Sequence, residues 1–199
     1  MRKSTNQTKK RIVSAAWELF YQYGYENTTI DDIVARSKSS KGAFYHYFDS
    51  KDSLLSSLSY LFDDKYAELM EHADPSLNPV EQLIMLNKEL FLMIENTVSV
   101  PLLAQLFSNQ VITKGERHLY SPDRMYYKVL RQIAIEGKNQ GLFREDLSVN
   151  DVVQAYSMYE RGMMYDWCIS NGRYSLCQYS EKMLPIYLRG MLKDPALIP

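Results

Sequence analysis

Residues 39–48 combine residue types that suit contact with a nucleic acid. The first five, Ser-Ser-Lys-Gly-Ala, are small, carry hydroxyl groups and include one cation. A helix that enters the major groove of DNA must be slim and polar at its N-terminal end, because its backbone has to approach the duplex and its side chains have to reach base edges. In the next five residues, Phe44 and Phe48 can anchor the helix and leave the three residues between them free to meet phosphate or sugar. The alternative is a plain helical hairpin, which is common in all-α proteins.

Charge is distributed unevenly along the chain. The 199 residues include 23 Lys and Arg against 24 Asp and Glu. Residues 1–51 hold nine of these cations and five of these anions, a local net charge of +4, so the remainder carries −5. Lys51 opens the helix that follows the polar run and adds its charge to the positive end of the helix dipole. This asymmetry suggests that the N-terminal quarter meets a polyanion.

Helical periodicity predicts the elements that must position the polar run. Apolar residues recur at steps of three and four over residues 12–23, and Gly24 then supplies a stop. A Thr-Thr pair caps a brief second helix, and a Ser-Ser pair caps a third over residues 41–46. A fourth helix is predicted over residues 51–72. Three short helices, the last two joined by a tight turn, match the layout of a helix-turn-helix.

The rest of the chain also has helical periodicity throughout. Residues 78–79 and 121–122 each place a cap residue before a proline, which favours a helix start at the proline. Residues 101–109, 151–170 and 175–193 show further helical patterns. Since no segment shows sustained period-two alternation, the sequence predicts an all-α protein with about nine helices.

Several other classes of protein are disfavoured by what the sequence lacks. The longest apolar run, residues 90–94, is far shorter than the roughly 18 residues that a membrane span needs, so we expect no membrane partner and a cytoplasmic location. Cys168 and Cys177 fit no zinc or redox spacing, and the three histidines are far apart, so we expect no metal and no cofactor. The sequence contains no nucleophile elbow, P-loop or dinucleotide fingerprint, and we therefore expect no enzyme.

Two motifs in the first fifty residues follow a known family pattern. The first is the run Ile12-x-x-Ala15-Ala16-x-x-Leu19-Phe20-x-x-x-Gly24-Tyr25-x-x-Thr28-Thr29-x-x-x-Ile33. The second is the run Ser40-Lys41-Gly42-x-x-Tyr45-x-x-Phe48-x-x-Lys51-x-x-Leu54. They resemble the first two helices, the recognition helix and the start of the connecting helix of the TetR family of one-component transcriptional regulators. The rest of the chain is similar to that family in layout only.

Two residues depart from the pattern of the resembled family. Where the family usually has a turn glycine and then a valine, this chain has Lys38 and Ser39. A lysine in a left-handed turn costs on the order of 1 kcal/mol, and the serine loses an apolar contact. Either the turn is built differently here, or Lys38 adds a phosphate contact.

The resemblance implies roles for individual residues of the first fifty. On phosphates it places Thr29, Tyr45 and Lys51. Toward the bases or the groove edge it places Lys41, Ala43 and His46, with Gly42 allowing close approach. Phosphate contacts set register, whereas contacts to base edges specify sequence. With their neighbours, the predicted DNA-binding residues are Thr29, Lys38, Ser39, Ser40, Lys41, Gly42, Ala43, Tyr45, His46, Tyr47 and Lys51.

A second copy of the chain is expected on DNA. One recognition helix reads only a few base pairs, so tight binding ordinarily needs two copies on a pseudo-palindrome. The resembled family packs its last two long helices into a four-helix bundle between subunits, which implies residues 151–170 and 175–193 here. The predicted dimer-interface residues are Tyr156, Tyr159, Gly162, Met163, Leu176, Met183, Tyr187 and Gly190.

The middle helices are expected to enclose a ligand cavity. Ten methionines and sixteen tyrosines suit an adaptable pocket, because thioethers fill irregular shapes and phenols offer an apolar face with a polar tip. The predicted ligand-binding residues are Phe62, Tyr66, Met70, Phe91, Met93, Phe107, Met125, Tyr126 and Tyr165. The ligand would shift the fourth helix and so change the separation of the two recognition helices.

Together these features predict a helix-turn-helix DNA-binding domain in residues 1–50 and a larger helical domain for ligand binding and dimerisation in residues 51–199. The expected function is that of a homodimeric repressor that a small apolar or amphipathic effector releases from a pseudo-palindromic, double-stranded DNA operator. The alternative within the same mechanism is that the ligand activates transcription. The alternative function is a helical protein-binding adaptor of this fold that no longer reads DNA.

Overall fold

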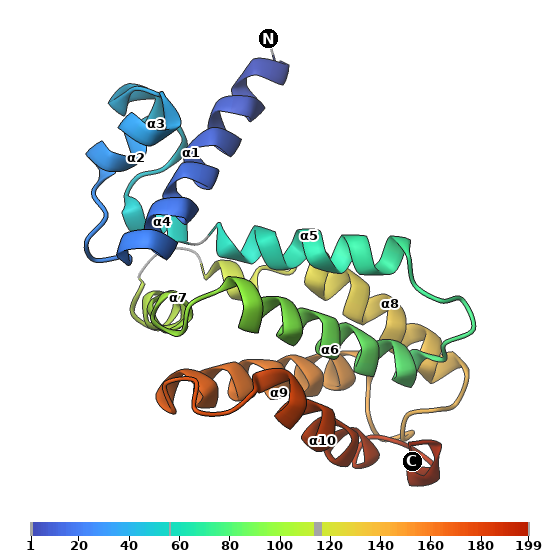
Figure 1. Cartoon of the computed structure of the whole chain (residues 1–199). Helices are drawn as coiled ribbons and strands as arrows, with labels where there is room; N and C mark the ends of the chain where they lie inside the picture. The colour runs from blue at the N-terminus through green and yellow to red at the C-terminus, as the bar shows by residue number, and fades with distance from the viewer. Residues whose placement is uncertain (1, 56, 114–116, 199) are drawn as a thin grey trace. The chain divides into compact units, whose positions relative to one another are not determined.

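The chain folds into helices, as the sequence predicts. A computed structural model describes residues 2–55, 57–113 and 117–198, and within these residues it contains helices and a single isolated antiparallel bridge, between Phe143 and Leu192 (Figure 1). The α-helices are α1 (Arg2–Tyr23), α2 (Ile30–Ser37), α3 (Lys41–Tyr47), α4 (Lys51–Leu55), α5 (Leu58–Glu71), α6 (Pro79–Thr97), α7 (Val100–Ile112), α8 (Met125–Asn139), α9 (Val149–Ile169) and α10 (Leu176–Arg189). Two short 3-10 helices are η1 (His118–Tyr120) and η2 (Pro195–Leu197). No single helix of the described residues is long and apolar enough to cross a membrane, and α6 and α7 reach that length and composition only when taken together across a break.

The helices form two compact units. The first comprises Met1–Tyr60 and Pro101–Leu119, and the second comprises Leu61–Val100 and Tyr120–Pro199. The chain therefore passes from the first unit to the second within α5. The predicted division after residue 50 falls earlier in the chain than this boundary.

The first unit contains the three helices of the predicted helix-turn-helix. Helix α1 buries one apolar face, with Ile12 and Phe20 almost fully removed from solvent. It ends at Gly24, whose φ of +84° is a conformation that favours glycine. Helix α2 begins after Thr29 with a reciprocal capping box, in which the Thr29 side chain accepts from the Asp32 amide and the Asp32 side chain accepts from the Thr29 amide. These features confirm the predicted end of the first helix and start of the second.

The prediction of a single fourth helix over residues 51–72 is wrong. The structure contains two helices, α4 and α5, because the chain turns at Ser57, whose amide donates to the Leu54 carbonyl. The indole Nε1 of Trp17 donates to Ser57 Oγ at 3.1 Å, so a side chain of α1 fixes this turn. Helical periodicity alone gives no sign of such a tertiary bond.

Helix starts are confirmed where a side chain caps the first turn. Asn78 caps α6, which begins at Pro79, and Ser175 caps α10. The predicted start at residues 121–122 is wrong, because α8 begins only at Met125. There the Asp63 carboxylate, which comes from α5, accepts from the Tyr126 amide at 3.2 Å and replaces a local cap.

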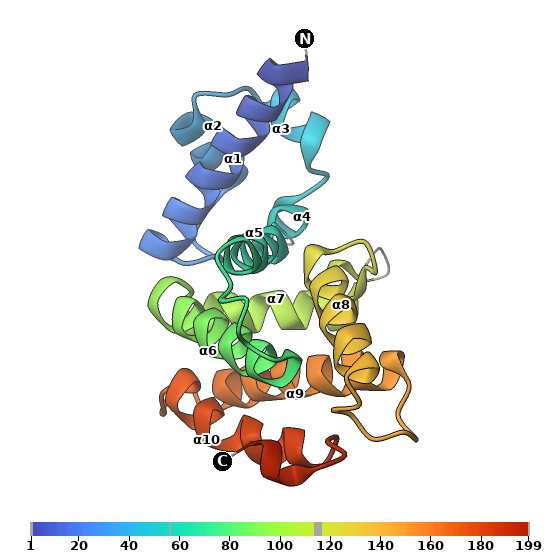
Figure 2. The same cartoon turned by 90° about the vertical axis from the view of Figure 1, so that its right-hand side faces the viewer.

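The second unit is a bundle of α5, α6, α8, α9 and α10. Helix α6 lies between α5 and the pair formed by α9 and α10, and it also packs on α8 (Figures 1 and 2). Its buried side includes Leu83, Leu86, Leu90 and Phe91, so the predicted apolar face of this helix forms part of the core. The bundle thus brings five helices around one interior.

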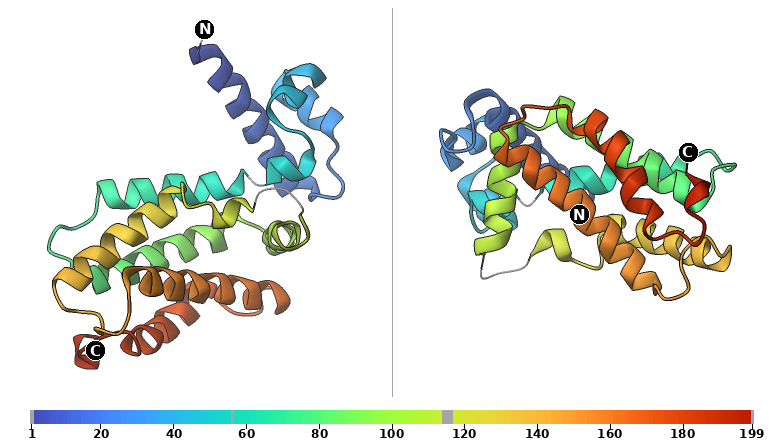
Figure 3. Two further views of the ribbon diagram at one scale, coloured as in Figure 1. Left: turned by 180° about the vertical axis from the view of Figure 1, so that it is seen from behind. Right: turned by 90° about the horizontal axis from the view of Figure 1, so that it is seen from below.

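A bend after α8 joins the ends of α8 and α10, which lie close together (Figure 3). Gly141 has a φ of +69°, and Phe143 then packs on Gly137, where a β-carbon would lie only 2.3 Å from Phe143 Cε2. The Arg144 amide donates to the Met191 carbonyl at 3.0 Å, and the Lys193 amide donates to the Leu142 carbonyl at 2.9 Å. These two bonds fasten the segment after α10 to the bend.

Candidate functional site

In the turn between α2 and α3, Lys38 adopts the left-handed backbone conformation, which was one of the two alternatives that the sequence allowed. Lys38 has φ 50° and ψ 45°, its amide donates to the Ala35 carbonyl, and the Ser39 amide donates to the Val34 carbonyl. Ser39 forms a 2.8 Å hydrogen bond with the hydroxyl of Ser37, which is buried. The turn therefore has the conformation that a glycine would adopt, although a lysine occupies the position. The hydrogen bond between the Ser37 and Ser39 hydroxyls replaces the apolar contact that a valine would make.

Small residues lie at the exposed N-terminal end of α3. Ser40 caps the helix by accepting from the Ala43 amide at 3.1 Å. Ser40, Lys41 and Gly42 are exposed, and Ala43 is half-buried. A β-carbon at Gly42 would meet nothing closer than Ser40 Oγ at 3.9 Å, so this end of the helix is slim and open. The structure thus provides the exposed polar edge that entry into a groove requires.

The aromatic run on α3 separates into buried anchors and more exposed residues. Phe44 and Phe48 are buried, as predicted. Tyr45 is 53% exposed, His46 is exposed, and the half-buried Tyr47 packs edge-on against His46. Their predicted contacts with phosphate, sugar or base edges remain predictions.

Two of the three lysines in the predicted DNA-binding set, Lys41 and Lys51, already have partners within the first unit. Lys41 Nζ lies 2.8 Å from an Asp31 carboxylate oxygen, both side chains are more than 60% exposed, and this pairing raises the pKa of Lys41. Lys51 Nζ donates to the carbonyls of Tyr25 at 2.7 Å and Thr28 at 3.0 Å, and it lies 4.1 Å from the centroid of the Tyr25 ring. Lys51 therefore ties the start of α4 to the loop before Thr29, a role that the sequence did not indicate.

Lys9 is a cation beside α3 that the predicted site leaves out. Its Nζ lies 5.8 Å from the centroid of the Phe48 ring. The residue comes from α1, more than twenty residues before the motif, so motif spacing gave no reason to include it. The basic charge near the recognition helix is therefore larger than the predicted set implies.

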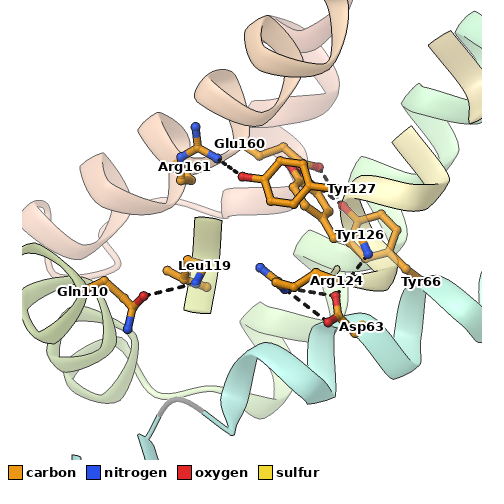
Figure 4. Close-up of polar contacts among 9 residues, drawn as sticks. All are labelled: Asp63, Tyr66, Gln110, Leu119, Arg124, Tyr126, Tyr127, Glu160 and Arg161. Atoms are coloured by element: carbon orange, nitrogen blue, oxygen red, sulfur yellow. Dashed lines mark hydrogen bonds and ion pairs between the residues drawn. The ribbon is translucent and has the colours of Figure 1, made fainter. Parts of the chain in front are cut away.

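A buried acid lies at the centre of the second unit (Figure 4). Glu160 on α9 is 1% exposed, and its carboxylate accepts hydrogen bonds from Tyr66 of α5, Asn87 of α6 and Tyr126 of α8. The donor-acceptor distances are 3.1 and 3.2 Å for the Tyr66 hydroxyl, 3.0 Å for Asn87 Nδ2 and 2.9 Å for the Tyr126 hydroxyl. We call these four residues the Glu160 cluster.

Burial controls the electrostatics of the Glu160 cluster. It raises the pKa of Glu160, while hydrogen bonds from Asn87, Tyr126 and Tyr66 act in the opposite direction. Burial followed by the nearby Glu160 charge raises the pKa of both Tyr66 and Tyr126, so these phenols stay protonated and can donate. Asn87 in turn accepts from Ser180 of α10 at 2.5 Å, so the polar network reaches five helices.

An ion pair lies beside the cluster. Asp63 of α5 and Arg124 pair at 3.0 Å, with side chains that are only 12% and 9% exposed. Tyr126 joins the ion pair to the cluster, because its amide donates to Asp63 and its hydroxyl donates to Glu160 (Figure 4). Two residues one helical turn apart on α5, Asp63 and Tyr66, are thus each held by groups from outside that helix.

The predicted ligand-binding residues lie in different surroundings. Phe62, Tyr66, Phe91 and Tyr126 are buried, and Met70, Met93 and Phe107 are half-buried. Met125 is 40% exposed and Tyr165 is 57% exposed, and their predicted contacts with a ligand remain predictions. Phe107 belongs to the first unit. Tyr66 and Tyr126 are brought together, with ring centroids 5.1 Å apart.

Glu160 was missed because a single acid in an apolar helical pattern is usually taken as a surface residue. The available signal was its position on the helix: Tyr156 and Met164, four residues before and after it, are both buried. An acid on that face must be buried with them.

The predicted dimer residues also divide. Tyr156 and Leu176 are 0% exposed, so their side chains belong to the core of the monomer, and their assignment to an interface is wrong. Gly162, Tyr187 and Gly190 are exposed, and Tyr159, Met163 and Met183 are half-buried. Large apolar side chains that the prediction missed are exposed on the same two helices: Met158, Tyr165 and Ile169 of α9, and Tyr179 and Ile186 of α10. We call the exposed apolar surface formed by these five residues and Tyr187 the α9–α10 face.

Comparison with known proteins agrees with this architecture. Residues 12–58 match the profile of a family described as bacterial regulatory proteins, tetR family, and residues 61–190 match that of the C-terminal region of YsiA-like proteins. A 65-residue stretch, 32% of this chain and 22% of the relative, is 42% identical to the uncharacterized HTH-type transcriptional regulator YuxN of Bacillus subtilis. Over 196 residues, 95% of each chain, the protein is 28% identical to the HTH-type transcriptional repressor KstR2 of Mycobacterium tuberculosis.

A solved structure shares the fold. The transcriptional regulator FadR from Bacillus subtilis, determined in complex with stearoyl-CoA, superposes with a TM-score of 0.71 at 20% sequence identity, covering 92% of this chain and 99% of that one. Together, the left-handed turn before α3, the open N-terminal end of that helix and the two matched regions show that this chain belongs to the TetR family of bacterial transcriptional regulators.

Proposed function

We propose that this protein is a ligand-responsive, DNA-binding transcriptional regulator that acts in the cytoplasm as a homodimer and has no catalytic activity. It binds a pseudo-palindromic operator as a repressor and leaves the operator when a small apolar or amphipathic effector binds its second unit. The observation that carries the proposal is the exposed, slim and polar N-terminal end of α3, held by the buried anchors Phe44 and Phe48.

DNA binding is tested with the purified full-length protein by fluorescence anisotropy. The probe is the DNA upstream of the protein's own gene, with a shuffled sequence of equal length as the competitor. We expect tighter binding to the upstream DNA, and affinity for both that falls steeply with salt because phosphate contacts release counterions. Equal and salt-insensitive binding, or none, would refute the regulator and favour the adaptor function.

Dimerisation is supported by the α9–α10 face. It presents six large apolar side chains on two adjacent helices, which is the kind of patch that marks a protein interface. We expect a dimer in sedimentation velocity, and we expect Ile169→Glu or Ile186→Glu to shift it toward the monomer. The matched control is Val111→Glu on α7, which makes the same change at a similarly exposed apolar residue of the first unit. A wild-type monomer at micromolar concentration would contradict the dimer.

The effector class is supported by the character of the second unit and by its relatives. Its described core is rich in aromatic and aliphatic side chains, with polar groups confined to a few hydrogen-bonded positions such as the Glu160 cluster. FadR was crystallised with stearoyl-CoA, an amphipathic molecule, and that compound is the first probe for this chain. We expect it to release the protein from the upstream DNA. Release by stearoyl-CoA and not by coenzyme A alone would identify the apolar chain as the recognised part.

A further inference from the structure

Glu160 is an acid buried without a cation partner in the part of the chain that the structure describes. The residue is 1% exposed, and within the described ranges no Lys, Arg or His nitrogen lies within ion-pair distance of its carboxylate. A buried carboxylate without a cation is costly, and well-packed apolar residues in its place are often more stabilising. Packing alone therefore does not account for an acid at this position.

The donors to Glu160 come from three other helices, and one of those helices connects the two units. Tyr66 lies on α5, and its hydroxyl is within 3.2 Å of both carboxylate oxygens. The chain enters the second unit within this same helix, which follows the DNA-reading residues by way of α4. The position of α5 within the second unit is therefore coupled to the Tyr66–Glu160 bond.

A second polar contact holds α5 one turn before Tyr66. Asp63 pairs with Arg124 and accepts from the Tyr126 amide, and the Tyr126 hydroxyl returns to Glu160. The two contacts on α5 thus share Tyr126 as a common neighbour (Figure 4). Polar networks of this kind specify one arrangement when every member is satisfied, and they are costly when a member is lost.

We propose that Glu160 is a positioning residue of the effector response: through Tyr66 it holds α5 in the arrangement that binds operator DNA, and effector binding releases that bond. This inference rests on the proposed function. An effector achieves the release only by binding more tightly to the arrangement in which Tyr66 and Glu160 are apart.

If this mechanism holds, protonation of Glu160 should change how firmly α5 is held. The titratable groups that interact with Glu160 are Tyr66 from α5, Tyr126 from α8, and Tyr156 and Tyr159 from α9. Asn87 and Ser180 complete the network from α6 and α10. The Tyr66 hydrogen bond stabilises the carboxylate, so acid favours the state in which that bond is absent. Burial acts oppositely on the whole fold, because the buried acid is more stable when protonated. Acidification should therefore loosen α5 while it stabilises the domain.

The first test measures hydrogen exchange of the full-length protein by mass spectrometry. In Tyr66→Phe we expect exchange of the amides of residues 61–71 to rise about tenfold relative to α1, since one hydrogen bond to a charged group is lost. The matched control, Tyr174→Phe, removes a tyrosine hydrogen bond to another carboxylate of the second unit, that of Asp166, and it should leave the α5 amides within about twofold of wild type. Unchanged exchange of α5 in Tyr66→Phe would overturn the proposal.

The second measurement repeats the exchange between about pH 5 and pH 8, corrected for intrinsic amide rates. Wild-type α5 should exchange faster toward low pH, and Glu160→Gln, which keeps the shape without the charge, should show no such slope. A purely structural role for Glu160 would give parallel profiles in the two proteins, which would overturn the proposal.

The third measurement uses an operator selected from a random DNA library with the wild-type protein. Tyr66→Phe should bind this operator at least about threefold more weakly and bind random DNA equally well, because the first unit remains folded. Unchanged operator affinity would overturn the role of Glu160. If the wild-type protein selects no DNA sequence, the proposed function is overturned instead. The hydrogen-exchange experiments would still test whether Glu160 positions α5.

Discussion

Two charged sites, one in each unit, are held in opposite ways. In the first unit, Lys41 and Asp31 meet in water, with both side chains more than 60% exposed. In the second unit, Glu160 is removed from water and is held by neutral donors from three helices. An exposed pair costs little to separate and can be exchanged for DNA, whereas a buried carboxylate costs much to disturb and can therefore store a conformational preference.

Truncating the buried acid should have the largest effect. Glu160→Ala leaves Tyr66, Asn87 and Tyr126 without their acceptor and opens a cavity, so we expect a loss of about 3–5 kcal/mol in the free energy of unfolding. Urea denaturation of the DNA-free protein measures this. A loss below about 1 kcal/mol would show that the cluster contributes no more than a typical single hydrogen bond and would remove the contrast between the units.

Removing only the charge of the same residue should have a smaller effect that depends on pH. Burial raises the pKa of Glu160 above its value in the unfolded chain. The stability contributed by this group is therefore fully present below the ordinary glutamate pKa and is lost as the pH rises through its pKa in the folded protein. We expect the wild-type Tm to fall relative to that of Glu160→Gln as the pH rises from about 5 to 8. Parallel Tm profiles would contradict the raised pKa.

In the first unit, the largest effect is expected at its best-anchored cation. Lys51→Ala removes two hydrogen bonds to the carbonyls of Tyr25 and Thr28, so we expect a loss of about 1–2 kcal/mol together with weaker binding to all DNA sequences. Lys51→Met removes the same two hydrogen bonds but keeps an aliphatic side chain. The difference in stability between the two variants therefore measures the contribution of packing. Full stability of both variants would show that Lys51 serves DNA contact alone.

The turn lysine should give a gain in stability. Lys38→Gly relieves a left-handed conformation and should stabilise the protein by about 0.5–1 kcal/mol, as seen in thermal unfolding. Ala35→Gly, which lies within α2, is the matched control and should destabilise by a similar amount. If the stabilised variant also binds DNA less tightly, the lysine contributes a phosphate contact. A loss of stability in Lys38→Gly would contradict the turn geometry.

The smallest change in stability is expected at the exposed pair. Lys41→Ala should leave the Tm unchanged, because its partner Asp31 is solvated, and it should reduce the preference for operator over random DNA. Anisotropy titrations on both DNAs measure this preference. An equal loss on both would reassign Lys41 from base edges to phosphate.

Local patterns in the sequence predicted the first unit well. The stop at Gly24 and the short third helix follow from periodicity and backbone preference, which act over a few residues. The break between α4 and α5 depends on Trp17 reaching Ser57 across 40 residues, and no local pattern encodes that contact. The late start of α8 has the same cause, since its cap comes from Asp63.

The second unit was harder to predict for a related reason. Periodicity identifies the faces of α9 and α10 but does not say which face a neighbouring helix covers. Tyr156 and Leu176 were therefore placed at an interface although the bundle buries them, and Tyr165 and Ile169 were not. Glu160 required knowledge of Tyr66 and Asn87, which lie 94 and 73 residues away.

The backbone bridge between the bend after α8 and the segment after α10 has a consequence for assembly. Because the Arg144 and Lys193 amides close this bridge, the chain is fixed just before α9 and just after α10 before any second copy arrives. A surface that is already ordered loses little conformational entropy on association, so less contact energy is spent on ordering it. Dimers of this chain should accordingly form from rigid subunits, with a rate set by diffusion and orientation and not by refolding.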